Sequence, residues 1–240
     1  MIEKTKGIVV KTTKYSETSL VIKVFTEAFG MRTYMIRGVR KKKSRTPLNL
    51  FQALSILDMV VYEKSGRDIQ NTKEVKSGYI YSTIPYDIKK TSIVIFLNEM
   101  VYKAVQEEEP NPKLFNFIFH SLVFLDEIQE NYQDFHLSFM LHLTRHLGFP
   151  PSDNYLKNQE IFDLLEGRYT SFKLPVATSI HPPLSAFFFQ LSQNTSFDKE
   201  IQMKRKDRQE LLKKILQYYQ FHLPGFGELK SLDVLRQVMA

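Results

Sequence analysis

The segment LVIKVFTEAFGMRTYMI, residues 20–36, contains two short apolar and β-branched runs with a turn between them. Residues 20–25 and 31–36 have the length and the alternation of strands. Gly30 lies in the turn and can adopt the positive φ that a tight hairpin needs. The sequence therefore predicts a β-hairpin here. The side chains that alternate onto one face of its second strand are those of Arg32, Tyr34 and Ile36.

Three more segments before residue 80 resemble strands. Residues 7–12 and 55–62 are short and rich in β-branched residues, and a weaker strand is expected within residues 69–75. Five short strands favour a small closed barrel over an open sheet, because closure removes the exposed strand edges.

After Pro85 the apolar period changes to that of helices. Asn111 and Pro112 supply an N-cap and a first-turn proline, and Gly148 ends a later helix. The helices are expected at residues 92–106, 113–130, 135–147, 184–192, 204–221 and 231–238. A less regular segment covers about 152–183. We therefore expect a multi-domain α and β fold, with a barrel domain at residues 1–80 and a helical domain at residues 81–240 that carries an irregular insertion at 152–183.

Composition narrows the class of protein. With 240 residues, of which 43% are hydrophobic, the chain can bury a substantial core. It contains no cysteine, which excludes disulfides and thiolate metal sites. The N-terminus lacks the apolar core of a signal peptide, and the apolar runs are too short to span a bilayer. We expect a cytoplasmic protein with no membrane partner.

Positive charge is concentrated in the first third of the chain. Residues 1–80 hold 16 Lys and Arg against 7 Asp and Glu, a net charge of +9, whereas residues 81–240 hold 17 against 19, a net charge of −2. Within this part, residues 37–45 (RGVRKKKSR) contain six cationic side chains, and no acid lies between Glu27 and Asp58. Such uncompensated charge is typical of a binding surface for a polyanion.

The cationic segment follows a strand and precedes a Thr-Pro pair, so it is expected in a loop at the rim of the barrel. Lys11, Lys14 and Tyr15 of the first loop are expected on the same side. Cations follow the backbone of a single-stranded nucleic acid, and an aromatic ring stacks on a base. The residues predicted to contact nucleic acid are Lys14, Arg32, Tyr34, Arg37, Arg40, Lys41, Lys42, Lys43 and Arg45, with Tyr34 as the stacking residue. An acidic protein or a membrane surface is the alternative ligand of such a loop, and a solvated basic loop is the alternative without a ligand.

A second basic cluster lies near the C-terminus. Its possible accessory basic face consists of Lys204, Arg205, Lys206 and Arg208. Asp207 and Glu210 can pair with cations of the same helix, so a solvated helix face is the favoured interpretation.

Signals of catalysis are weak. No glycine-rich phosphate loop and no G-x-S-x-G motif occurs. His142 and His146 share a helix face with His136 nearby, but a zinc site would need ligands from elsewhere, so ordinary helix histidines are the better interpretation. A metal-dependent hydrolase that uses these histidines, and an RNA-binding barrel protein of translation or RNA processing, remain as alternatives to a DNA-binding protein.

Several short motifs in order resemble the RecO family of bacterial DNA repair mediators. The N-terminal motifs are GIVVKT at residues 7–12, YSETSL at 15–20, VFT at 24–26 with Gly30, RGVRK at 37–41 and KSR at 43–45. Further matches are LNE at 97–99, HLGF at 146–149 with Pro151, and LKS at 229–231. The resemblance covers nearly the whole chain and is sparse after residue 100.

This resemblance implies an N-terminal five-stranded OB-type (oligonucleotide/oligosaccharide-binding) barrel followed by an all-α helical domain. It also implies a non-enzymatic protein that binds single- and double-stranded DNA, anneals complementary strands and helps RecA to displace single-strand-binding protein. The implied partners are RecR and the acidic C-terminal tail of single-strand-binding protein, with RecA reached indirectly. Many members carry a four-cysteine zinc site after the Leu-Gly-Phe element, but residues 152–171 contain no cysteine. No metal or other cofactor is therefore expected, and packing around Phe162, Leu164 and Leu165 has to hold that segment.

Overall fold

The computed structural model describes residues 1–41, 46–197 and 201–239. The chain forms two compact units, Met1–Glu127 and Ile128–Ala240. The domain boundary expected between residues 80 and 81 lies inside the first unit and stays a prediction. Within the described ranges, no helix has both the length and the apolar character that crossing a bilayer requires.

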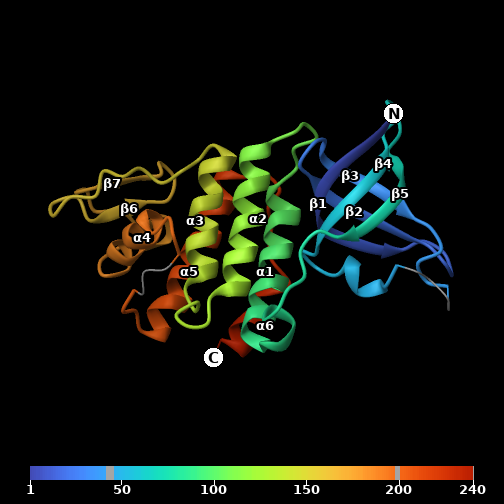
Figure 1. The fold of residues 1–240 in the computed structure, drawn as a ribbon. Coiled ribbons are helices and arrows are strands. Elements are labelled where there is room, and N and C mark those ends of the chain that lie inside the picture. The colour runs from blue at the N-terminus through green and yellow to red at the C-terminus, as the bar shows by residue number, and fades with distance from the viewer. Residues whose placement is uncertain (42–45, 198–200, 240) are drawn as a thin grey trace. The chain divides into compact units, whose positions relative to one another are not determined.

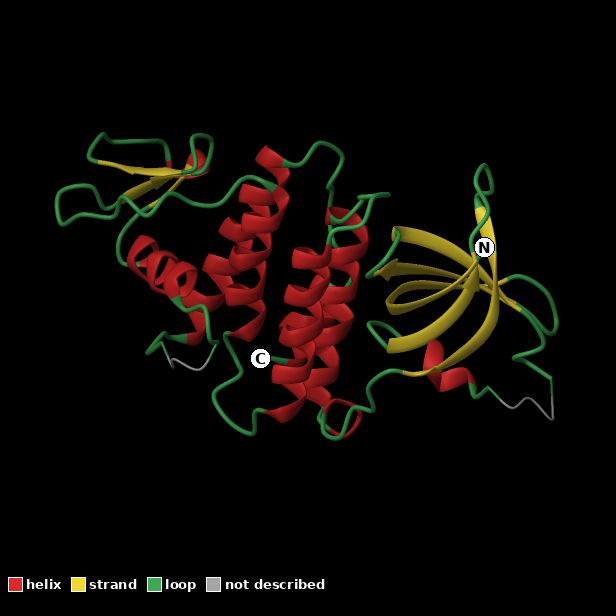
Figure 2. Cartoon of the chain, turned by 45° about the horizontal axis from the view of Figure 1, so that its top comes forward, coloured by secondary structure: helices red, strands yellow, loops and turns green. Residues whose placement is uncertain are grey.

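Five strands of the first unit form a closed barrel in the order β1-β2-β3-β5-β4 (Figures 1 and 2). All neighbouring strands are antiparallel except β3 and β5, which pair in parallel. The predicted fold class is confirmed. The strands are β1 (Ile2–Lys14), β2 (Leu20–Thr26), β3 (Gly30–Ile36), β4 (Ile56–Tyr62) and β5 (Ile69–Ser77).

Strand β1 closes the barrel because it pairs with two neighbours. Its first half pairs with β4 and its second half with β2, with Gly7 and Ile8 in both ladders. A Cβ atom on Gly7 would come within 2.5 Å of the Val24 side chain, so only glycine fits at this crossing. The strand is longer than the predicted 7–12, since its polar first residues pair with β4.

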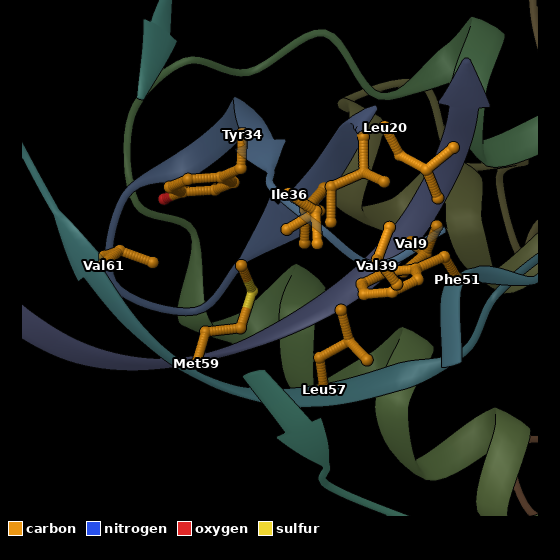
Figure 3. Packing of buried hydrophobic residues seen from close by; sticks show 11 residues of the cluster. Val9, Leu20, Tyr34, Ile36, Val39, Phe51, Leu57, Met59 and Val61 are labelled. Carbon is orange, nitrogen blue, oxygen red and sulfur yellow. The ribbon is translucent and has the colours of Figure 1, made fainter. Parts of the chain in front are cut away.

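The interior of the barrel is filled by apolar side chains from all sides (Figure 3). The 3-10 helix η1 (Leu48–Phe51) contributes Phe51, and the segment after β3 contributes Val39. The cluster of buried residues is Val9, Leu20, Ile22, Val24, Tyr34, Ile36, Val39, Phe51, Leu57, Met59 and Val61. Because Tyr34 and Ile36 of β3 belong to this cluster, they are not available at the surface.

Two helices complete the first unit. Helix α1 (Ile88–Ala104) follows the 3-10 helix η2 (Ile84–Tyr86), and the Asp87 carboxylate caps it by accepting from the N–H groups of Lys89 and Lys90. Helix α2 (Pro112–Glu127) begins as predicted, because the Asn111 side chain accepts from the Leu114 N–H at 3.1 Å.

The loop between α1 and α2 contacts the β2–β3 hairpin. The Glu107 carbonyl accepts from the Met31 N–H at 2.8 Å. Gly30 has φ +67°, as the hairpin prediction required, and a Cβ there would collide with the carbonyls of Glu107 and Glu109. Gly30 is therefore needed both for the turn and for this contact.

The described residues of the second unit form the helices α3 to α6 and a small sheet. Helix α3 (Phe135–Leu147) ends at Gly148 with φ +89°, which agrees with the prediction. The other helices are α4 (Leu184–Gln193), α5 (Arg205–His222) and α6 (Leu232–Val238). The segment expected to be irregular contains a three-stranded sheet in the order β7-β6-β8, with β6 (Ile161–Asp163), β7 (Arg168–Thr170) and β8 (Ser179–Ile180), besides the 3-10 helix η3 (Val176–Thr178).

Candidate nucleic-acid interface

Strand register brings two loops together at one end of the barrel. Lys14 is opposite Leu20 in the β1–β2 ladder, and Leu20 is opposite Ile36 in the β2–β3 ladder. The β1–β2 turn (residues 15–19) and the segment after β3 (residues 37–41) therefore leave the barrel side by side. We call these residues, with Lys14, the rim.

Two hydrogen bonds from Arg40 to backbone carbonyls hold the two segments of the rim together. The Arg40 N–H donates to the Thr18 carbonyl at 3.2 Å, and the Arg40 guanidinium donates to the Ser16 carbonyl at 3.0 Å. Val39 inserts its side chain into the barrel core, and Gly38 has φ +71°. Arg40 is therefore mainly a residue that positions the segment, with part of its side chain committed to the neighbouring turn.

The other described cations of the rim face solvent. Lys14, Arg37 and Lys41 are exposed, and none has a carboxylate within ion-pairing distance among the residues described. Tyr15 is 65% exposed and supplies an aromatic ring at the same end. Lys42, Lys43 and Arg45, which were also predicted to contact nucleic acid, lie outside the described residues.

Tyr34 was predicted to stack on a base, and this prediction is wrong for the structure. Its ring lies inside the barrel among the core side chains (Figure 3) and is 0% exposed. Its hydroxyl donates to the Glu63 carboxylate at 2.7 Å. Burial, followed by the hydrogen bond to Glu63, raises the pKa of the Tyr34 phenol well above its usual value. Alternation had placed Tyr34 with Ile36 correctly, but their shared face is the interior.

Arg32 is separated from the rim. It lies four residues before Ile36 on β3, roughly 13 Å towards the opposite end of the strand. Its guanidinium donates to the Glu108 carbonyl at 2.7 Å, and its Nε lies 3.9 Å from the Glu63 carboxylate. The prediction that Arg32 joins the phosphate contacts of the rim is therefore corrected: this side chain ties the α1–α2 loop to the barrel.

The accessory basic face on the second unit is smaller than predicted. Lys204, Arg205 and Lys206 are exposed, at or beside the start of α5. Arg208 is corrected, because its guanidinium forms an ion pair with the Asp134 carboxylate and is largely buried. The remaining three cations stay a prediction.

Two histidines of α3, His136 and His142, are buried packing residues. His142 is 5% exposed, and its Nε2–H donates to the Asn194 carbonyl at 2.9 Å. Burial lowers the pKa of His142 to about 4, against the opposing effect of that hydrogen bond. Burial, with the Arg208 charge, lowers the pKa of His136 to about 3. In the ranges that the structure describes, no three His, Asp or Glu side chains come close enough together to hold a metal ion.

The residues of the small sheet do not fit a thiolate zinc site, because they include no cysteine. Aromatic packing holds the segment instead: the Phe162 ring lies 4.4 Å from Phe188 and 4.9 Å from Tyr169, centroid to centroid. The Asn154 side chain exchanges two hydrogen bonds of 2.9 Å with the backbone of Tyr169. Of the residues predicted to hold this segment, Phe162 and Leu164 are buried and Leu165 is exposed.

Sequence comparison identifies relatives over the whole chain. The family described as "Recombination protein O N terminal" matches residues 1–81, and "Recombination protein O C terminal" matches residues 85–233. A Bacteroides fragilis protein named DNA repair protein RecO is 34% identical over 240 residues, which is 99% of each chain. Proteins with the same name from Phocaeicola vulgatus (33% over 242 residues, 100% of each chain) and Flavobacterium johnsoniae (34% over 239 residues, 99% of each chain) are similar.

Proposed function

The chain belongs to the RecO family of DNA repair proteins, and from this premise we propose that its barrel rim binds the phosphates of single- and double-stranded DNA and brings complementary strands together. The family places the chain among DNA repair and recombination mediators, not among enzymes. One observation carries the proposal: the register Lys14–Leu20–Ile36 brings the exposed cation at the end of β1 and those of the segment after β3 to one end of the barrel.

The physical basis is charge neutralisation. Two complementary strands repel each other through their phosphates, and cations that contact both backbones reduce this repulsion. Lys14, Arg37 and Lys41 supply such cations, and Arg40 keeps the part of its side chain that is not committed to Ser16. Lys42, Lys43 and Arg45 are proposed to join them from the adjoining segment. Tyr15 takes over the stacking role once expected of Tyr34, because its ring is exposed beside these cations.

The number of phosphate contacts determines how strongly DNA binding depends on salt. If about six cations each meet one phosphate, the slope of log K against log[salt] for a single strand is roughly −4 to −5, at about −0.7 per contact. A variant with Lys14→Gln, Arg37→Gln and Lys41→Gln, here called the rim variant, loses about three contacts and shows a slope shallower by roughly 2. Arg40 stays unchanged in this variant, so that the loop keeps its anchor.

The partners are proposed from the family alone. We propose that the chain assists RecA on DNA coated with single-strand-binding protein, through RecR and the acidic C-terminal tail of that coating protein. No described residue is assigned to either contact. Such a role places the protein with the bacterial chromosome in the cytoplasm.

The deciding experiment measures annealing of complementary oligonucleotides coated with single-strand-binding protein. Wild type is expected to accelerate annealing, and the rim variant to lose most of that acceleration. The matched control, Lys4→Gln with Lys113→Gln, removes exposed charges from β1 and from the start of α2, away from the rim, and is expected to behave as wild type. Equal annealing by the rim variant and the control would remove the rim from the mechanism. An RNA oligonucleotide of the same sequence tests the RNA-binding alternative.

A further inference from the structure

Two lysines face each other on the outer surface of the barrel, away from the rim loops. Lys11 of β1 is directly opposite Lys23 of β2 in the antiparallel ladder. Like charges in this position repel and destabilise the strand pair unless a third group compensates them. Nothing in the sequence patterns singled out this pair, because its members lie 12 positions apart and only the β1–β2 register joins them.

Tyr102 of α1 lies against both ammonium groups. The Lys11 Nζ donates a hydrogen bond of 3.0 Å to the Tyr102 hydroxyl, and lies 4.9 Å from the ring centroid. The Lys23 Nζ lies 5.4 Å from the same centroid. The hydrogen bond from Lys11 lowers the pKa of the Tyr102 phenol, against burial and in the same direction as the two ammonium charges. A neutral ring attracts cations but cancels no charge.

The positive charge of the pair is not balanced by an acid. No carboxylate lies within 4.0 Å of Lys11 or Lys23 among residues 1–41, 46–197 and 201–239. Glu99, on the same helix as Tyr102, pairs with Lys103 at 3.8 Å. An open groove of about 330 Å³ adjoins Lys11 and Tyr102 and is lined also by Thr12, Phe51 and Glu99, so a ligand group has access from solvent on the side of Lys11.

We propose that Lys11, Lys23 and Tyr102 form a phosphate site for a nucleic-acid strand that continues from the rim along β1. A phosphate can accept from both ammonium groups. It can also accept the phenol hydrogen, which is available because the Tyr102 oxygen accepts from Lys11. This site rests on the proposed DNA-binding function and extends it to the outer faces of β1 and β2.

Continuity with the rim favours a nucleic-acid phosphate over the carboxylate of an acidic protein. Lys11 and Lys14 lie on the same strand, three residues and roughly 10 Å apart. This odd spacing directs their side chains to opposite faces of β1, so a nucleic-acid strand bound at the rim has to pass over the edge of the barrel to reach Lys11. In a duplex, consecutive phosphates of one strand rise roughly 3.4 Å along the helix axis, so this distance corresponds to about three nucleotides. One strand bound at the rim can therefore place a later phosphate between Lys11 and Lys23.

The test uses the full-length protein and fluorescence anisotropy with a labelled oligothymidylate over a range of salt. The double variant Lys11→Gln with Lys23→Gln is expected to bind on the order of tenfold more weakly at low salt, with a slope shallower by about 0.7 for one lost phosphate. The variant Lys11→Arg with Lys23→Arg keeps both charges and is expected to restore most of the affinity. Lys4→Gln with Lys113→Gln has the same loss of charge and is expected to match wild type.

The outcomes separate this inference from the proposed function. If wild type binds with a steep salt slope, the rim variant weakens binding, and the Lys11/Lys23 double variant equals the control, then the phosphate site is overturned while the rim stands. If wild type itself shows no salt dependence, the proposed function fails first. An acidic peptide titrated in parallel gives the third outcome: binding that depends on Lys11 and Lys23 for the peptide but not for DNA would assign the pair to a protein partner instead.

Discussion

Thr83 and Asp126, 43 residues apart, are joined by three hydrogen bonds. The Asp126 carboxylate accepts from the Thr83 N–H at 2.8 Å and from its hydroxyl at 3.2 Å, and the Thr83 hydroxyl also lies 2.5 Å from the Asp126 carbonyl. The N–H groups of Ser82 and Ile84 donate to the same carboxylate. The end of α2 thus holds the segment that leads from the barrel to α1.

Replacement of Asp126 by Asn is expected to destabilise the protein by about 2–4 kcal/mol, because the amide brings donors to a buried site where donors already converge. Urea unfolding followed by circular dichroism measures this change. Asp68→Asn, at an exposed position, is the control and is expected to change stability by less than about 0.5 kcal/mol. Equal effects of the two substitutions would contradict the role of Asp126.

Acid is expected to weaken the protein over two overlapping pH ranges. Burial lowers the pKa of His142 to about 4 and of His136 to about 3, below the usual 6.5. Since the unfolded chain binds these protons first, their contribution to stability is complete above about pH 6.5 and falls as pH decreases to about 4 for His142 and to about 3 for His136. Burial acts to raise the pKa of Asp126, but the N–H donors of Ser82, Ile84 and Thr83 outweigh it and lower this pKa to about 2. Its contribution is lost only between about pH 3.8 and 2.

The variant His142→Gln isolates the contribution of His142 to the loss of stability in acid. It keeps a donor for the Asn194 carbonyl and removes one titrating group, so the fall in stability between about pH 6.5 and 4 should become smaller by roughly 3 kcal/mol at most. Urea unfolding at a series of pH values measures it. An unchanged pH profile would show that His142 is not the group responsible.

Substitution of Tyr15 is expected to weaken DNA binding, whereas substitution of Tyr34 is expected to lower stability alone. Tyr15→Ala removes an exposed ring at the rim and should weaken single-strand binding by about 1–3 kcal/mol, the usual range for base stacking. Tyr34→Phe removes only the hydroxyl that donates to Glu63, so it should lower stability by about 1 kcal/mol and leave the affinity for DNA unchanged. Anisotropy titrations and urea unfolding of both variants check the pair. A loss of affinity in Tyr34→Phe alone would reverse the assignment.

Chelator treatment is expected to leave the melting temperature unchanged, because aromatic side chains hold the small sheet of the second unit. Phe162→Ala, in contrast, should destabilise the protein by about 3–5 kcal/mol by leaving a cavity beside Phe188 and Tyr169. Phe172→Ala is the control, since that ring is 77% exposed. A melting temperature that falls with chelator would contradict this explanation.

Local sequence signals predicted the elements well but not the inward face of β3. The positive φ of Gly30, the cap at Asn111 and the end of α3 at Gly148 were predictable, because each depends on one residue and its immediate neighbours. Alternation groups Tyr34 with Ile36, yet a period of two does not say which group points inside. Closure of the barrel decides that, through contacts with Met59 and Val61 of a distant strand.

Long-range pairing explains the remaining differences at the site. Arg32 could be taken for a surface cation because its partners, Glu63 and the Glu108 carbonyl, lie 31 and 76 residues away. The Lys11–Lys23 pair depends on strand register in the same way. Conversely, the cationic segment after β3 was predictable, because charge density and a missing acid are local properties of the chain.

The hydrogen bonds between Asp126 and the segment after the barrel also bear on folding during synthesis, because Asp126 is made later than that segment. At roughly 5–20 residues per second, a ribosome needs about 2–9 s to proceed from Tyr81 to Asp126. During this interval the newly made strands can pair, while the amides of Ser82, Thr83 and Ile84 have only water as a partner. All five barrel strands have therefore been synthesised several seconds before Asp126, the residue of α2 that binds the segment after the barrel.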